Sequence, residues 1–412
     1  PKGTDGTSGA DVVHGGGIQA SAPAAKAPLT LADRLAQTAD ARHSAISSTR
    51  NKHNVRAYNS SSDWLAMSFS LRNRGLFTLR QPMLLVAICA CGFTSVAEKY
   101  GDVCETPFFL AETYEAFSLM ITALAFMLVF RLNRSATRHY GAGELCGGMM
   151  IHARDLALSA TAMLSRTSPA TRDRLCEVAV AFPVAFMLHI WGDTEEGAEG
   201  GARGDKRGYY ARGYYDHRGR EARFEAMVEG VFAEASTLAT IAKARHRPLA
   251  LIEHAVSVIH EALGPGGSDV QRASPLEAAV LQRLLNAAQG LGVPLSGCER
   301  IQGTPLPFVY VAHLRFFLVL VLCLVPFMFA CQWQWQTVPL SLLVALALLG
   351  IEAASVECER PFSDRPSKNH HDVERFAVLL STEVSHMLLR ADARAAGDDP
   401  PPSPSPHRRA SV

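Results

Sequence analysis

The sequence has 412 residues, of which 48% are hydrophobic, 8% aromatic and 19% charged, and its formal net charge is +1. This length and hydrophobic content fit either two or three soluble domains or one domain joined to a few membrane spans. The near-neutral charge gives no basic excess that would indicate a nucleic-acid partner, and no acidic excess that would indicate a solvating tail.

The N-terminal part of the chain, residues 1–62, is expected to be an arm without a packed fold. Residues 1–60 contain no glutamate and are rich in Ala, Ser and Thr, with scattered Lys and Arg. This composition resembles that of an organelle transit peptide. A disordered cytosolic arm is an equally good interpretation.

Four apolar stretches stand out further along the chain: Pro82–Ala97, Ala116–Phe130, Phe316–Trp335 and Val338–Ile351. Only the third reaches the ~20 residues that a helix needs to cross a bilayer core of about 30 Å. The shorter stretches fit helices that extend past the apolar band with polar turns or face a water-filled cavity. A buried core helix is the alternative for any one stretch alone, but four together argue against a soluble protein. They predict two membrane helix pairs, within 63–135 and 313–356.

The charges that flank these stretches predict how the helices are oriented. Arg72, Arg74 and Arg80 precede the first stretch, and Glu98, Asp102 and Glu105 follow it. Arg131, Arg134 and Arg138 follow the second stretch, and Arg315 directly precedes the third. By the positive-inside rule, both helix pairs start and end on one side of the membrane. The N-terminus, the middle region and the C-terminus should therefore share a compartment.

The middle region, 136–312, has the pattern of a helical soluble domain. Ser274, Pro275 and Glu277 form a helix-start signal. In the sequence AAVLQRLLNAAQGLG that follows, apolar residues recur at intervals of three and four residues. Weaker helical patterns lie at about 144–164, 173–191, 222–245 and 248–263. The thirteen-residue run Val178–Ile190 is too short for a further span and fits a buried helix of a bundle.

Three other segments complete the predicted organisation. Residues 192–222 contain RGYY twice, and a solvated, flexible insertion is favoured there over an RNA-stacking surface because acidic residues are interleaved. Residues 357–394 are expected to form a C-terminal helical segment. The Pro- and Ser-rich residues 395–412 are expected to form a disordered tail.

The second apolar stretch carries a regular stripe of side chains. Thr122, Phe126 and Phe130 are four residues apart, so they drift only about 40° per step around a helix and form a stripe roughly 12 Å long. Such a stripe either lines a path or forms a seam between helices. Periodicity alone favours the seam.

Three segments resemble signatures of the bestrophin family. They are FRLNRSATRHYGAGELCGG from Phe130, CERIQGTPLPFVYVAHLRFFLVL from Cys298 and GIEAASVECERPFSDRP from Gly350. They occur in the family's order and spacing, and the resemblance covers roughly residues 65–390. The segments are most similar to those of the bacterial, plant and algal branch. The residues that carry it, apart from the pore and arginine positions, are Asn133, Glu299, Arg300, Pro305, Pro307, Glu352, Pro361 and Phe362.

The resemblance implies an all-α membrane protein that forms a homopentameric anion channel. Each subunit would have four membrane helices and a large helical domain on the cytosolic or stromal side. Thr122, Phe126 and Phe130 would line an apolar neck on the five-fold axis, where a hydrophobic ring can gate by dewetting. Thr122 replaces an apolar residue of the family and should make the outer ring more polar.

The implied permeant ion is chloride or bicarbonate, because a neck without a specific ligand discriminates poorly between small monovalent anions. Arg131, Arg134 and Arg138 would raise the local anion concentration at the inner mouth. For each of them, an ion pair with Glu144 or another acidic group is the alternative. The expected partners are the lipid bilayer and further copies of the chain, with no nucleic acid.

The sequence departs from the family pattern just after the neck. An aromatic pair, a Glu and Arg, and a Trp are usual there, whereas this chain has His139, Tyr140, Gly141, Gly143 and Cys146. Subunit packing below the neck is therefore expected to differ from that of the family. This departure favours a second hypothesis, a non-conducting bestrophin-fold subunit of a larger membrane assembly such as a photosynthetic one.

No metal, cofactor or enzymatic activity is expected. Asp364 stands near Arg365 and Lys368 in the segment where animal relatives carry an acidic calcium cluster, so a calcium site is not predicted. His370 and His371 are adjacent and should point apart. Phosphate-loop, His-Glu-x-x-His and Cys-x-x-Cys motifs are missing, and the nine cysteines are assigned to packing.

The favoured location is the chloroplast thylakoid membrane, with the plasma membrane second. This preference depends on the plant and algal resemblance and on the transit-like composition of the N-terminus.

Overall fold

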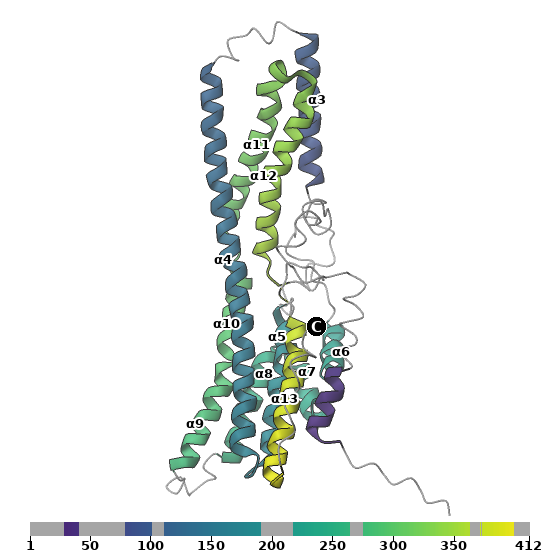
Figure 1. Cartoon of the computed structure of the whole chain (residues 1–412), viewed down its shortest axis with the longest axis vertical. Helices are drawn as coiled ribbons and strands as arrows, with labels where there is room; N and C mark the ends of the chain where they lie inside the picture. The colour runs from purple at the N-terminus through teal and green to yellow at the C-terminus, as the bar shows by residue number, and fades with distance from the viewer. Residues whose placement is uncertain are drawn as a thin grey trace, which may run out of the picture.

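The computed structural model describes residues 29–40, 79–100, 111–190, 217–263, 275–362, 371 and 373–398. Within these ranges every regular element is a helix. The helices form two bundles that follow one another along the long axis of the molecule, here called the upper and the lower bundle (Figure 1).

One helix, α4 (Ala111–Leu164), runs through both bundles (Figure 1). Its 54 residues correspond to a length of roughly 80 Å at 1.5 Å per residue. The boundary expected at 135/136 between a membrane pair and a soluble domain falls inside this helix and stays a prediction. The helical pattern at 144–164 is confirmed as helix, but it is the last part of α4. Charged residues end the apolar band at Arg131, but the helix continues with Ser135, Ala142 and Cys146 buried, because tertiary packing of one face stabilises a helix more than residue propensity does.

The upper bundle contains α3 (Arg80–Lys99), the first part of α4, α11 (Phe308–Trp333) and α12 (Thr337–Glu359). A short 3₁₀ helix, Gln334–Gln336, joins α11 to α12, which fold back along each other (Figure 1). In the described part of the chain, three stretches are long and apolar enough to cross a membrane: Arg80–Lys99, Tyr114–Leu164 and Phe308–Glu359. The last of them holds both α11 and α12. The four apolar stretches of the sequence all lie in this bundle.

The lower bundle is built around α5 (Pro169–Ile190), in which every residue from Leu175 to Ile190 is buried. Around it lie the second part of α4, α8 (Arg247–Leu263), α9 (Pro275–Gly290), α10 (Gly292–Gly303) and α13 (Val373–Ala396). The prediction that Val178–Ile190 is a buried bundle helix is confirmed. The single helix expected at 222–245 is instead two helices, α6 (His217–Met227) and α7 (Ala235–Lys243).

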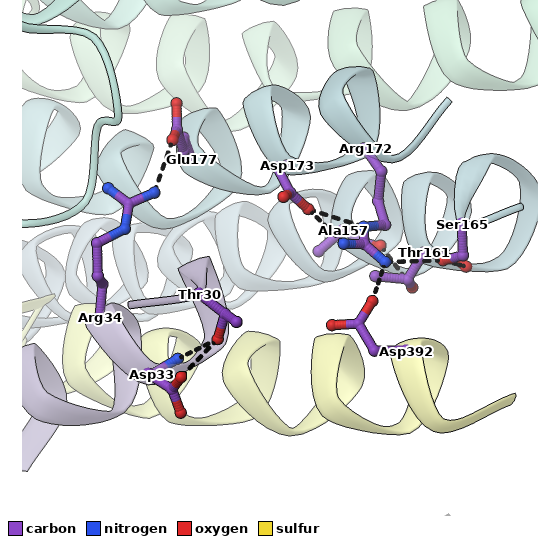
Figure 2. Close-up of polar contacts among 10 residues, drawn as sticks. All are labelled: Thr30, Asp33, Arg34, Ala157, Thr161, Ser165, Arg172, Asp173, Glu177 and Asp392. Atoms are coloured by element: carbon purple, nitrogen blue, oxygen red, sulfur yellow. Dashed lines mark hydrogen bonds and ion pairs between the residues drawn. The ribbon is translucent and has the colours of Figure 1, made fainter. Parts of the chain in front are cut away.

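Residues 31–40 form a helix that packs into the lower bundle. Leu31, Ala32, Leu35 and Ala39 are buried, because their spacing places them on one helical face. Arg34 pairs with Glu177 of α5 at 3.4 Å, and Thr30 and Asp33 hydrogen-bond across the start of the helix (Figure 2). The prediction of an unstructured arm over 1–62 is therefore wrong for this segment. Residues 1–28 and 41–62 lie outside the described residues.

The N-terminal helix, the middle region and α13 share one hydrophobic core. Arg172 of α5 pairs with Asp392 and fixes α13 to the centre of the bundle (Figure 2). These three regions therefore pack together in the lower bundle, whereas their location in one compartment stays a prediction. Residues 191–216 of the predicted insertion, including both RGYY copies, and residues 399–412 of the tail lie outside the described part, whereas residues 217–222 begin α6.

Among the described cysteines, three follow the packing interpretation fully, whereas Cys91 is exposed. Cys146, Cys176 and Cys298 are buried free thiols, and burial raises the pKa of Cys176 well above its usual range. Cys331 is disulfide-bonded, so a pure packing role is wrong for that residue.

Candidate pore-lining site

The stripe of Thr122, Phe126 and Phe130 lies on an exposed face of α4. The Phe126 and Phe130 side chains are 63% and 62% exposed in the single chain, and Thr122 is exposed as well. Leu124 and Leu128, on the opposite face of the same helix, are buried in the core of the upper bundle. The stripe is therefore not a seam between the described helices of one chain. Contact with lipid, contact with another copy of the chain and a pore lining all fit this exposure.

The exposed face continues along α4 below the stripe. Asn133, Tyr140, Ile151 and Leu158 are all exposed, and at 100° per residue they fall within about 80° of the stripe on the helix surface. From Thr122 to Leu158 this face extends for roughly 54 Å. Large exposed apolar side chains along one face indicate contact with another molecule or a path between molecules.

The Thr122 hydroxyl is already used inside its own helix. It donates a hydrogen bond to the main-chain carbonyl of Ser118, with an oxygen–oxygen distance of 2.8 Å. A hydroxyl that is bonded in this way offers less polarity to its surroundings than a free one. The expected increase in polarity of the outer ring is therefore smaller than the residue type alone suggests.

Arg131 is fully buried, although it directly follows Phe130. Its Nε lies 2.6 Å from Oε2 of Glu352, and its Nη2 lies 3.4 Å from Oε2 of Glu359. Arg315 Nε binds the other carboxylate oxygen of Glu352 at 2.7 Å. The Arg131–Glu352 contact does not have hydrogen-bond geometry, so it is an ion pair. Of the two interpretations of Arg131, the structure shows the ion pair, with glutamates of α12 rather than Glu144.

The other two arginines differ from each other. Arg138 is partly buried and donates hydrogen bonds to the main-chain carbonyls of Ile301, Thr304 and Glu359. It thereby ties α4 to the ends of α10 and α12. Arg134 is exposed and has no ion-pair partner among the described residues. Of the three arginines, only Arg134 offers an exposed, unpaired charge one turn below Phe130.

The remaining motif residues mostly shape the chain between the two bundles. Pro305 and Pro307 lie in the non-helical residues 304–307 between α10 and α11, where the missing proline N–H groups and the restricted backbone interrupt a helix. The carbonyl of Pro361 accepts a hydrogen bond from the His371 amide at 3.2 Å. Phe362 packs on the lower core. Asn133 and Arg300 are exposed.

The residues that depart from the family pattern lie in an unbroken part of α4, where His139, Gly143 and Cys146 are packed and Tyr140 is exposed. The His139 ring stacks on the His371 ring with centroids 4.6 Å apart. A Cβ at position 143 would lie 2.9 Å from the His371 ring, so glycine allows this close approach. Cys146 is buried. The segment expected to lack a calcium site, including Asp364, Arg365, Pro366, Lys368 and His370, lies outside the described residues.

A model of the family described as Bacterial/Fungal Bestrophin protein matches residues 56–372. The chain belongs to the bestrophin family. The resemblance inferred from the three segments is thereby confirmed.

Similar proteins include two chloroplastic voltage-dependent chloride channels of Arabidopsis thaliana. Channel 1 is 26% identical over 248 residues, which are 60% of this chain and 50% of that protein. Channel 2 is 25% identical over 305 residues, which are 72% of this chain and 63% of that protein. The chain thus aligns with about half to under two thirds of these relatives.

The fold is also similar to solved structures. A mutant of a bacterial bestrophin homologue from Klebsiella pneumoniae superposes with a TM-score of 0.56 at 19% identity, covering 75% of this chain and 98% of the other. At this level of identity, the likeness supports the fold alone.

Proposed function

We propose that the chain is one subunit of a homopentameric anion channel. In this proposal α3, α4, α11 and α12 cross the bilayer, and the lower bundle lies on the cytosolic or stromal side. The observation that carries the proposal is the exposed stripe of Thr122, Phe126 and Phe130 on α4 of a bestrophin. Five copies of this face around one axis form a narrow apolar neck.

The chemistry of the neck suits anions. A ring of phenylalanine side chains excludes water when narrow, and the edge of an aromatic ring is positive whereas its face is negative. Arg134 is exposed one turn below the neck, and five such charges raise the local anion concentration. The names of the Arabidopsis relatives, which are chloride channels, support the same choice of ion. Chloride and bicarbonate are both proposed to pass.

The second candidate is a non-conducting structural subunit. The altered residues His139, Gly141, Gly143 and Cys146 below the neck favour it, because they replace the family pattern at the expected subunit contact. The packing of His139 and Cys146 inside the chain weakens this argument, since the changes are accommodated within one subunit.

Two measurements on the purified full chain test the proposal. Native mass spectrometry in mild detergent should give five copies of the 44.5 kDa chain, and a monomer or dimer would contradict the assembly. Planar-bilayer recording under a chloride gradient should give currents that reverse near the chloride equilibrium potential. A stable pentamer without current would instead support the structural subunit.

The proposed location is the chloroplast thylakoid membrane, supported by the chloroplastic relatives. Immunodetection in fractionated chloroplasts should find the protein with thylakoids. Detection in the plasma membrane fraction would contradict this proposal while leaving the channel proposal intact.

A further inference from the structure

Three side chains from separate segments of the lower bundle meet at one point. They are His189 in the last turn of α5, His246 directly before α8, and Glu299 on α10. The Nε2 atoms of both histidines lie 2.8 Å from the same oxygen, Oε1 of Glu299. The two imidazole centroids are 4.2 Å apart. One nitrogen or oxygen from each residue lies within 4.8 Å of the other two.

We propose that His189, His246 and Glu299 bind a divalent transition-metal ion, with Zn²⁺ as the best match. Imidazole nitrogens and a carboxylate oxygen are ligands that zinc prefers, and three protein ligands leave a fourth position for water. Calcium and magnesium need six or more oxygen ligands, whereas this cluster offers one carboxylate. The inference does not depend on ion conduction.

The geometry requires only a small adjustment to hold the ion. Zinc bonds of 2.0–2.2 Å in a tetrahedral site place the ligand atoms about 3.3 Å apart. Each histidine–glutamate contact, now 2.8 Å, therefore has to open by about 0.5 Å. The side chains of His189, His246 and Glu299 are 11%, 34% and 38% exposed. This exposure lets an ion enter and lets water occupy the fourth position.

A purely hydrogen-bonded cluster is the competing interpretation. His246 Nδ1 accepts a hydrogen bond from the Leu249 amide at 3.2 Å, so the neutral ring carries its proton on Nε2, directed at Glu299. A metal at Nε2 shifts that proton to Nδ1 and ends the contact with Leu249. Metal binding thus exchanges these hydrogen bonds for two nitrogen–metal bonds and one oxygen–metal bond.

The metal would join segments that lead towards the upper bundle. Next to the cluster, Gln302 of α10 donates a hydrogen bond to the carbonyl of Ile190 at the end of α5, at 2.7 Å. Arg138 of α4 binds the carbonyls of Ile301 and Thr304 on the same end of α10. A metal at Glu299 therefore stiffens the part of α10 that contacts both α5 and α4.

The test uses the purified full chain in its oligomeric state, stripped with EDTA and titrated with Co²⁺ and then Zn²⁺. We expect one Co²⁺ per chain with the visible absorption of a tetrahedral nitrogen–oxygen site, displacement by Zn²⁺, and a higher melting temperature with Zn²⁺. His246→Gln and Glu299→Gln should each weaken binding at least about 10-fold. His260→Gln is the matched control, because His260 is an exposed residue of α8 outside the cluster, and it should bind like wild type.

Two results would overturn the proposal. Wild-type protein that binds no metal shows that the cluster is a hydrogen-bond network only. Binding that is equal in wild type and in His246→Gln shows that the ion goes elsewhere, for example to thiols. If the Glu299→Gln protein does not assemble, the His246→Gln protein alone decides whether the cluster binds metal. Removing the His246 imidazole leaves the His189–Glu299 contact in place.

Discussion

Arg131 of α4 and Glu352 of α12 form a buried ion pair, with 2.6 Å between Nε and Oε2. Glu359 and Arg315 extend the pair into a network of four charges. Desolvation of such charges is costly, so the network is stable only while every member keeps its partners. Arg131 directly follows Phe130 in the sequence, so its pairing with α12 fixes the rotation of α4 that leaves Phe130 exposed.

Arg131→Met should destabilise the subunit by about 3–5 kcal/mol, because it leaves two glutamates without their shared cation. Thermal unfolding and size-exclusion chromatography in detergent measure the effect. Arg134→Met is the matched control on the same helix, since Arg134 is exposed, and it should unfold like wild type. Equal stability of the two variants would contradict a structural role for the pair.

Arg134→Gln should lower anion current at low ionic strength and have little effect at high ionic strength. The reason is that an exposed charge acts through a field whose screening length is about 10 Å at 0.1 M salt and about 3 Å at 1 M. Bilayer recording at the two salt concentrations measures the ratio of variant to wild-type current. Arg300→Gln, an exposed arginine on α10, serves as control. A loss of current that is the same at both concentrations would argue against electrostatic attraction.

Glu177→Gln should change how stability depends on pH. Burial raises the pKa of Glu177 to about 7, although the Ala233 amide and Arg34 act in the opposite direction. Figure 2 shows the Arg34–Glu177 pair. The folded protein therefore binds the proton more tightly than the unfolded chain, and the contribution of Glu177 to stability falls as pH rises from about 4.5 to 7.

The glutamine variant lacks this titration, so its stability relative to wild type should be higher at pH 8 than at pH 5. The difference is on the order of 3 kcal/mol or less, at 1.36 kcal/mol per pKa unit. Melting temperatures at the two pH values measure it. Glu261→Gln, which removes an exposed partner of Arg174, should show no such change. A parallel pH dependence of wild type and Glu177→Gln would refute the buried-carboxylate interpretation.

Apolar length and helix-start signals predicted the positions of most helices from sequence. The full length of α4 was not predicted, because the end of the apolar stretch at Phe130 was interpreted as the end of the helix. The helix in fact continues through Arg131 to Leu164. The helix at 31–40 carried a readable signal, namely Thr30 at the cap and apolar residues at 31, 32, 35 and 39. The low glutamate content of the whole arm obscured it.

The candidate site was predictable only in part. The four-residue spacing placed Thr122, Phe126 and Phe130 on one face, but only tertiary packing shows that this face is exposed. Which of the arginines is buried depends on the position of Glu352 on another helix. His189 and His246 lie 110 and 53 residues from Glu299 in the chain, and no local spacing signals such a cluster.

Alanine substitution tests the proposal that Phe126 and Phe130 face a common conduction path. Both side chains are more than half exposed in the subunit, so Phe126→Ala and Phe130→Ala should leave the fold of the subunit almost unchanged. Leu128→Ala is the matched control, because Leu128 lies between them on α4 and is buried. That truncation should cost about 2–5 kcal/mol of stability.

The decisive measurement is the single-channel anion conductance of the Phe126→Ala and Phe130→Ala proteins, recorded on the same preparations whose oligomeric state has been determined. We expect pentamers with a higher conductance than wild type, because a wider apolar ring admits water more easily. Loss of the pentamer without any gain in current would contradict it, and would assign the stripe to a seam between subunits.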